Sequence, residues 1–202
     1  MYSLWTVYIL LSSEMYCSRK GKKISMRKTI IIIMTMFALC LSFTACGNRS
    51  STKNENSYGA VSEGEEMRDF TGELVGGGEL KLSDLKGRVI LLNFWATWCG
   101  PCVGEMPAFP KLVEKYGDDL ALVTVNVGED AETIQEFLDK NSYSDLTVFL
   151  DEDYAISDLY PSDGIPYTII IDREGVISAT QLGAVDADTM LDKYSSLIDA
   201  VL

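Results

Sequence analysis

Apolar stretches and polar breaks alternate along residues 69–202 in a pattern that predicts strands and helices in turn. The run 89–95 (VILLNFW) is almost continuously apolar, which is typical of a central strand buried on both faces. The run 131–141 places Ile134, Phe137 and Leu138 at helical spacing. We predict strands at 70–74, 80–82, 89–95, 120–127, 146–150, 167–171 and 176–180. We predict helices at 100–116, 131–141 and 188–202, with a short helical turn at 154–160.

The order of these elements predicts an α/β domain. Strands that alternate with helices form a sheet with helices on both faces, and a parallel β-α-β crossover is right-handed. Two turn signals predict hairpins, because the glycines at 76–78 separate the first two strands and the segment 172–175 (DREG) separates the last two. The folded domain is therefore predicted to extend from about residue 69 to residue 202.

The apolar run at 30–43 has the pattern of an export signal. It follows a basic pair at 27–28 and is shorter than the roughly 20 residues of a membrane-spanning helix, but it has the length of a signal-peptide core.

The run ends in 43–46 (FTAC), which resembles the lipobox of bacterial lipoproteins, although Phe43 stands where that family usually has Leu. The resemblance implies a lipoprotein signal peptide over 26–45 and a lipid on Cys46. An uncleaved membrane anchor is the alternative, and both readings place the domain outside the cytoplasm and at the membrane.

Two further segments lie outside the predicted domain. Met26 begins a complete signal peptide by itself, so we predict that residues 1–25 are an extension created by a mis-assigned start at Met1. The stretch 48–67 is polar and has almost no large apolar side chains, so it cannot bury enough surface to order itself. We predict that 46–68 is a flexible tether between the lipid and the domain.

The charge of the chain limits its partners. There are 17 Lys and Arg residues against 30 Asp and Glu residues, a net charge of −13. Six of the basic residues but only one acidic residue precede Cys46, so a processed chain is more acidic still. An acidic surface disfavours nucleic acid, whose phosphates bind Lys and Arg, and disfavours adsorption to anionic lipid. The acidity indicates solubility rather than a particular partner.

Cys99 and Cys102 stand where the predicted central strand gives way to a helix. Two cysteines three positions apart at a helix start can close a small disulfide. The unpaired N–H groups of the first helical turn favour the thiolate of Cys99, whereas Cys102 lies one turn further in and is expected to be more buried. One sulfur attacks a partner and the other resolves the mixed disulfide.

A CxxC pair has two other possible roles, as part of a zinc site or as a structural disulfide. Zinc needs four ligands, but the chain has no His, and the remaining cysteines, Cys17, Cys40 and Cys46, belong to the export segment or the lipid site. A structural disulfide that closes so short a loop gives little stabilisation. Redox catalysis without metal or cofactor is therefore the favoured reading of this pair.

The segment 95–102 (WATWCGPC) resembles the active-site motif of the thioredoxin superfamily. The wider pattern 93–99, with Glu105 and Pro107 downstream, resembles the TlpA/ResA-like branch of exported thiol–disulfide oxidoreductases. The resemblance covers 69–202. It implies a thioredoxin-like fold, with a central mixed β-sheet flanked by helices and an added N-terminal β-hairpin. It also implies dithiol–disulfide exchange through a mixed disulfide at the two cysteines.

The same resemblance assigns a proton acceptor. Cytoplasmic thioredoxins carry a buried Asp at the position of Asn93, and that Asp assists proton transfer to the second cysteine. Asn93 cannot titrate. The ResA-like branch instead has a Glu at the position of Glu105, which shares a helix face with Cys102. Burial near a thiol would raise the pKa of Glu105 and allow it to act as a base. The alternative is an ordinary surface glutamate.

Residues around the cysteines complete the expected site. The superfamily places a cis-proline opposite its CxxC, and Pro166 takes this position, which leaves the backbone of Ile165 free to pair with a bound peptide and keeps metal from the thiols. A trans proline opening a strand is the alternative. We expect Trp95 in the core and Trp98 over the thiolate, in contact with partners. Pro107 is expected to kink the helix that it interrupts.

The resemblance also bears on direction and partners. Gly100 and Pro101 between the cysteines resemble the dipeptide of reducing thioredoxins, which favours a reductase of extracytoplasmic protein disulfides. A reductase outside the cell needs electrons from across the membrane, and the family implies a DsbD/CcdA-like membrane thiol transporter as donor. Apocytochrome c, sporulation proteins and oxidised methionine-repair enzymes are the substrate options at the level of the family.

Two alternative functions use the same fold. A peroxiredoxin-like thiol peroxidase needs a Pro-x-x-x-Thr-x-x-Cys arrangement and an Arg, but Thr97 stands only two residues before Cys99 and no suitable proline precedes it. A non-catalytic lipoprotein binding module would have no use for an intact CxxC or for the proline at 166. The sequence favours the oxidoreductase over both.

Overall fold

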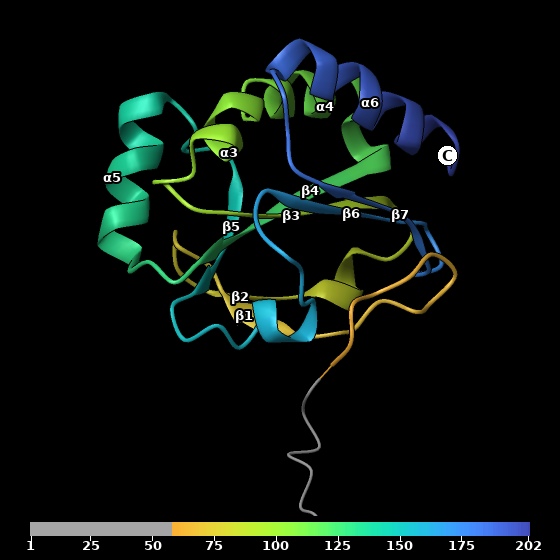
Figure 1. Ribbon diagram of the computed structural model, residues 1–202, viewed down its shortest axis with the longest axis horizontal. Coiled ribbons are helices and arrows are strands. Elements are labelled where there is room, and N and C mark those ends of the chain that lie inside the picture. Colours follow the sequence, from red (N-terminus) through yellow and green to blue (C-terminus); the bar gives the residue numbers. More distant parts are fainter. Residues whose placement is uncertain (1–57) are drawn as a thin grey trace, which may run out of the picture. The chain divides into compact units, whose positions relative to one another are not determined.

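The computed structural model describes residues 58–202, which form an α/β domain (Figure 1). The predicted extension 1–25, the signal peptide 26–45, Cys46 and the first part of the tether lie outside the described residues. No helix within 58–202 is long and apolar enough to cross a membrane.

A five-stranded mixed sheet forms the centre of the domain, in the order β5-β4-β3-β6-β7. Its strands are β3 (Val89–Trp95), β4 (Leu120–Val127), β5 (Thr147–Asp151), β6 (Tyr167–Ile171) and β7 (Ile177–Leu182). β3 pairs in parallel with β4, and β4 with β5, whereas β6 is antiparallel to both β3 and β7. The predicted mixed sheet is confirmed, and β3 is buried along its whole length.

One face of the sheet carries all of the α-helices found within residues 58–202. They are α3 (Gly100–Glu105), α4 (Ala108–Tyr116), α5 (Ala131–Asn141) and α6 (Ala187–Asp199). The chain steps from β3 to β4 to β5 in one direction, so crossovers of the same hand place α4 and α5 on the same side of the sheet. Ile134 and Leu138 of α5 accordingly share a core cluster with Phe109 and Leu112 of α4.

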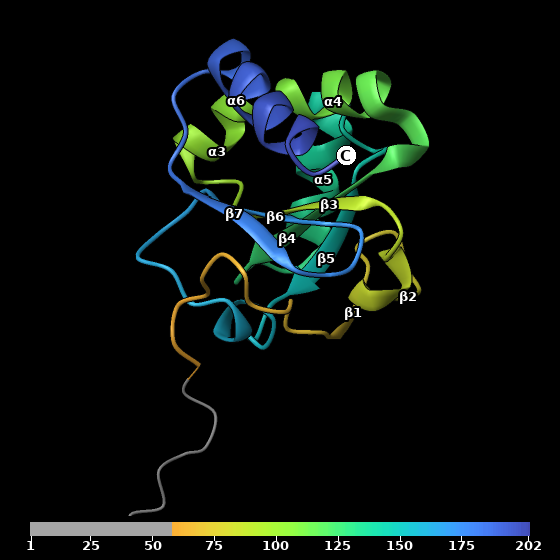
Figure 2. The same cartoon turned by 90° about the vertical axis from the view of Figure 1, so that its right-hand side faces the viewer.

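The opposite face is covered by shorter elements, which lie across the sheet from α4 and α6 in Figure 2. The predicted N-terminal hairpin is present as β1 (Thr71–Glu73) and β2 (Glu79–Lys81). Two 3₁₀ turns, Leu82–Leu85 and Ser157–Leu159, pack there as well. The helices expected on this second face are therefore single turns, and the predicted helical turn 154–160 is shorter than expected.

The helix predicted over 100–116 is divided. α3 ends at Glu105 and α4 begins at Ala108, with Pro107 at the N-cap position of α4. Proline has no N–H to donate and its ring crowds the preceding turn, so the interruption falls where a kink was predicted.

The N-terminal strap, residues 58–68, corrects the predicted domain boundary at residue 69. Within it, Gly64 N–H donates to Ile177 O and Ile177 N–H donates to Glu65 O, each at 2.8 Å. Val61 and Met67 are buried against the second face. These residues were predicted as tether because apolar side chains are sparse there, yet two buried side chains and pairing with the start of β7 attach the segment to the domain.

Candidate active site

Cys99 and Cys102 lie at the end of β3 and the start of α3, bonded to each other as a disulfide. Their Cα atoms are 5.3 Å apart. The backbone N–H of Cys102 points at Cys99 Sγ, with a separation of 3.3 Å between nitrogen and sulfur. Once the disulfide is reduced, this N–H can stabilise a thiolate on Cys99. Both cysteines are buried, and Cys102 is the more buried of the two, as predicted.

The loop before β6 faces the disulfide. Ile165 and Pro166 are joined by a cis peptide bond, as predicted. The carbonyl oxygen of Ile165 lies 3.8 Å from Cys99 Sγ, so the backbone expected to meet a peptide substrate lies beside this sulfur.

The two tryptophans of the motif differ in burial, and the prediction that Trp95 lies in the core is confirmed. Trp98, directly before Cys99, is 71% exposed, which leaves its ring available to partners. Trp95 is fully buried, and its indole N–H donates to Thr124 Oγ1 at 3.1 Å. Gly100 and Pro101, between the cysteines, are exposed.

Glu105 is fully buried at the end of α3, on the helix that also carries Cys102. Asn93 Nδ2 donates to its Oε1 at 2.9 Å, and Tyr194 donates to its Oε2 at 2.6 Å. Burial raises the pKa of Glu105 to about 7, against the opposing effect of these two hydrogen bonds. The reading of Glu105 as an ordinary surface glutamate is therefore wrong, and its carboxyl can exchange a proton near neutral pH.

Two residues of this network were not predicted from the sequence. Thr168, in β6, accepts from Asn93 Nδ2 at 2.9 Å, and its hydroxyl lies 2.9 Å from that of Tyr194 in α6. Both are polar positions on buried faces, since Thr168 interrupts an otherwise apolar strand and Tyr194 lies between Met190 and Ile198 at helical spacing. That signal marks buried polar groups without indicating what they contact.

A second group holds the loop that precedes the cysteines. Glu129, just after β4, accepts from Thr97 N–H at 2.7 Å and from Asn126 Nδ2 at 2.9 Å. The hydroxyl of Thr97 also donates to the Glu129 carboxylate. Neither Glu129 nor Asn126 was predicted, because both are distant in sequence from the motif. Within 58–202, no three His, Cys, Asp or Glu side chains gather as a metal site would require.

Comparison with known proteins agrees with this geometry. A buried CxxC disulfide at a strand–helix junction, opposite a cis-proline, defines a thiol–disulfide oxidoreductase of thioredoxin-like fold. The redoxin family model matches residues 62–198, and the chain belongs to this family.

Relatives and solved structures are similar over most of their length. The chain is 36% identical to thioredoxin-like protein YneN of Bacillus subtilis over 135 residues, which are 66% of this chain and 79% of YneN. It is 34% identical to the thiol-disulfide oxidoreductase ResA of Bacillus subtilis over 140 residues, 69% of this chain and 77% of ResA. A Chlorobium tepidum protein assigned as thiol:disulfide interchange protein DsbE superposes with a TM-score of 0.64 at 30% identity, covering 70% of this chain and 99% of that one. The exposed lipoprotein thioredoxin Etrx1 of Streptococcus pneumoniae superposes with a TM-score of 0.55 at 29% identity. The match covers 64% of this chain and 99% of Etrx1.

Proposed function

We propose that this oxidoreductase is a reductase of extracytoplasmic protein disulfides that works from a lipid anchor at Cys46. The observation that carries the proposal is the position of Cys99, which is directly preceded by the exposed Trp98 and whose Sγ lies 3.8 Å from the backbone carbonyl oxygen of Ile165, while Cys102 is more deeply buried. A protein substrate can reach Cys99 there while Cys102 stays covered.

The reaction has two exchange steps. The Cys99 thiolate attacks one sulfur of the substrate disulfide, forms a mixed disulfide and releases the other substrate sulfur as a thiolate. Cys102 then loses its proton and attacks Cys99 Sγ, which closes the disulfide of the structure and releases the second substrate sulfur. The two electrons pass from the enzyme dithiol to the substrate, whose thiolates take up protons.

Glu105 is the proposed acceptor of the Cys102 proton. It lies one helical turn from Cys102 on the same buried side of α3, and its pKa of about 7 suits a base near neutral pH. Asn93, at the position of the thioredoxin aspartate, cannot accept a proton and instead donates to Glu105.

Glu105→Gln should slow the exchange reaction and leave the fold intact, since the amide cannot take the proton. The measurement is the rate of reduction of a peptide disulfide between pH 5 and 9. Glu114→Gln, on the exposed side of α4, is the matched control and should behave as the unmodified protein. An unchanged rate across this range in Glu105→Gln would remove Glu105 from the mechanism.

The direction of electron flow is tested by the reduction potential of the Cys99–Cys102 couple. A value near that of thioredoxin, about −270 mV, supports the proposed reductase, and a value near that of DsbA, about −120 mV, contradicts it. Turnover in insulin reduction excludes the binding-module alternative, which would show none.

The anchor and donor are separate parts of the proposal. The similarity to a lipoprotein thioredoxin supports a lipid on Cys46, and Cys46→Ala should then move the protein from the membrane to the soluble fraction. Sequencing of the primary translation product decides between Met1 and Met26. Covalent trapping of Cys102→Ser with membrane proteins tests for a DsbD/CcdA-like donor, and trapping with exported proteins tests apocytochrome c and the other substrates.

A further inference from the structure

Four buried side chains from four elements form a closed ring of hydrogen bonds around the Glu105 carboxylate. The ring runs from Asn93 in β3 to Glu105 in α3, then to Tyr194 in α6, to Thr168 in β6 and back to Asn93. All four side chains are at most 1% exposed. Because the ring is buried, its protons can be assigned from the donors and acceptors once Glu105 is taken as ionised.

When Glu105 is ionised, each proton of the ring has one acceptor. Asn93 uses one Nδ2 proton on Glu105 Oε1 and the other on Thr168 Oγ1. Tyr194 gives its proton to Glu105 Oε2, so the proton between Tyr194 and Thr168 comes from the threonine. In this arrangement both carboxylate oxygens accept and neither carries a proton. A proton on Oε2 would force the hydroxyls of Tyr194 and Thr168 to reverse.

We propose that Tyr194 is a positioning residue of the exchange reaction, whose hydroxyl fixes the Glu105 carboxylate and holds it in the proton-accepting form. The inference rests on the proposed role of Glu105 as a base. It makes α6, which is far from the CxxC motif in sequence, part of the redox site.

The electrostatics around Glu105 support this role. The groups that face it are Asn93 from β3 and Tyr194 from α6, while Thr168 from β6 reaches it through Tyr194. No charged side chain within 58–202 contributes to its pKa, which burial raises and the two donors lower, Tyr194 more than Asn93. The pKa of Tyr194 is itself raised far above its ordinary value, mainly by burial and then by Glu105, so this hydroxyl remains a donor at any working pH.

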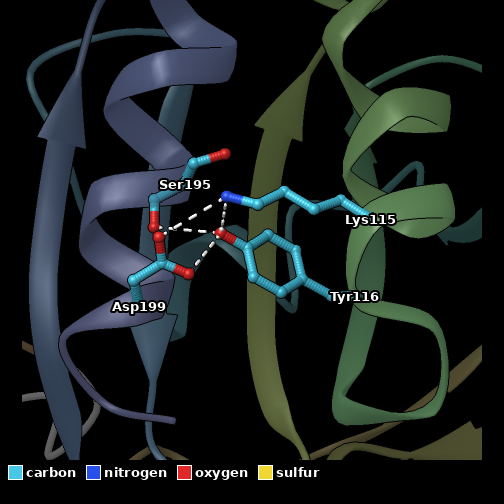
Figure 3. Close-up of polar contacts among 4 residues, drawn as sticks. All are labelled: Lys115, Tyr116, Ser195 and Asp199. Carbon is cyan, nitrogen blue, oxygen red and sulfur yellow. Dashed lines mark hydrogen bonds and ion pairs between the residues drawn. The ribbon is translucent and has the colours of Figure 1, made fainter.

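Tyr116 supplies a matched control, because its hydroxyl also joins α6 to a neighbouring helix (Figure 3). It lies 2.7 Å from Asp199 Oδ1 and 3.1 Å from the carbonyl oxygen of Ser195, and it accepts from Lys115 Nζ at 2.7 Å. None of these groups contacts Glu105. Tyr116→Phe therefore removes a tyrosine hydroxyl from the α4–α6 contact without touching the ring.

The experiment compares the pH profile of disulfide exchange in Tyr194→Phe and Tyr116→Phe. Loss of a donor to a carboxylate favours the protonated form, so Tyr194→Phe should move the midpoint of the profile to higher pH by about one to two units. A one-unit move from about 7 lowers the rate at pH 7 about fivefold. Tyr116→Phe should leave the midpoint in place. Adding Tyr194→Phe to Glu105→Gln should have no further effect on the rate.

The outcomes separate the two proposals. If Glu105→Gln leaves the rate unchanged, the proposed base is wrong and the inference falls with it. A second outcome is that Glu105→Gln slows exchange while the pH profile of Tyr194→Phe keeps the same midpoint as that of Tyr116→Phe. In that case the role of Glu105 as the base is retained, and only the inference about Tyr194 is overturned. Should Tyr194→Phe fail to fold, Thr168→Val tests the same ring, since it removes the donor to Tyr194 and should move the midpoint in the same direction. No such movement would overturn the inference.

Discussion

Glu105 is a carboxyl group that the fold removes from water, and the effect on stability depends on pH. Its pKa rises from an ordinary value of 4.5 to about 7 on folding, so the folded state binds this proton more tightly than the unfolded state. The contribution is most favourable below pH 4.5, declines between pH 4.5 and 7, and is constant above that. At 1.36 kcal/mol per unit, the decline is on the order of 3 kcal/mol.

Glu105→Gln should therefore remove this decline, because the amide does not ionise. Urea unfolding of the oxidised protein should show a stability difference between Glu105→Gln and the unmodified chain that shifts in favour of the variant by about 2.5 kcal/mol from pH 5 to pH 8. Glu114→Gln should follow the unmodified chain at both pH values. Parallel curves for all three proteins would show that Glu105 is not protonated preferentially in the folded state.

Single residues of the site differ in how far the sequence could reveal them. Cys99, Cys102, Glu105 and Pro166 stand at positions that a motif defines, and the structure brings them to one end of β3 and β6. Tyr194 meets Glu105 across 89 positions, a contact that depends on how α6 crosses α3. Helical spacing predicts that Tyr194 is buried, but burial alone does not identify its partner.

At the scale of elements, the loop between β3 and α3 depends on a side chain that follows β4. Glu129 accepts from the backbone and the hydroxyl of Thr97 and from Asn126, and so ties the loop before Cys99 to the neighbouring strand. This contact explains how a short loop with an exposed Trp98 can still present Cys99 in a fixed place.

Glu129→Gln should loosen this loop. Both carboxylate oxygens of Glu129 accept hydrogen bonds, and the substitution replaces one of them with an NH2 group that cannot accept. We expect a loss of about 1.5–3 kcal/mol in unfolding free energy, the range for hydrogen bonds to a charged group. Hydrogen exchange should show faster opening at the Thr97 amide. Glu136→Gln, on an exposed position of α5, is the control. Undiminished protection of the Thr97 amide in Glu129→Gln would contradict this role.

Element boundaries were predictable where one local signal decides them. β3, β4, α5 and β6 have the predicted bounds, and Asp130 caps α5 by accepting from Thr133 N–H at 2.8 Å. The break between α3 and α4 follows from Pro107. The face on which α5 packs was not predicted, because it depends on the direction in which successive strands are added to the sheet.

For the molecule as a whole, the N-terminal strap decides where the domain begins. Its polar sequence predicted a tether, but its backbone pairs with the turn between β6 and β7 and with the start of β7. Arg68 adds donors to the carbonyls of Gly59 and Leu159, and Tyr160 donates to the carbonyl of Arg68. The strap therefore holds the segment 159–160, which leads into the loop of Ile165 and Pro166 opposite the cysteines.

A chain that begins at Asp69 should consequently unfold at a lower temperature than one that begins at Tyr58. It loses the backbone pairing of Gly64, Glu65 and Met67 with the β6–β7 hairpin, and it exposes the apolar surface that Val61 and Met67 cover. The difference is measured by thermal unfolding of the two oxidised chains, with Val61→Ala and Met67→Ala in the longer chain as separate tests of burial. Because the strap also holds 159–160, the shorter chain should show faster hydrogen exchange at Tyr160. Equal unfolding temperatures for the two chains would show that residues 58–68 do not stabilise the domain. The domain would then begin at about residue 69, as the polar pattern predicted.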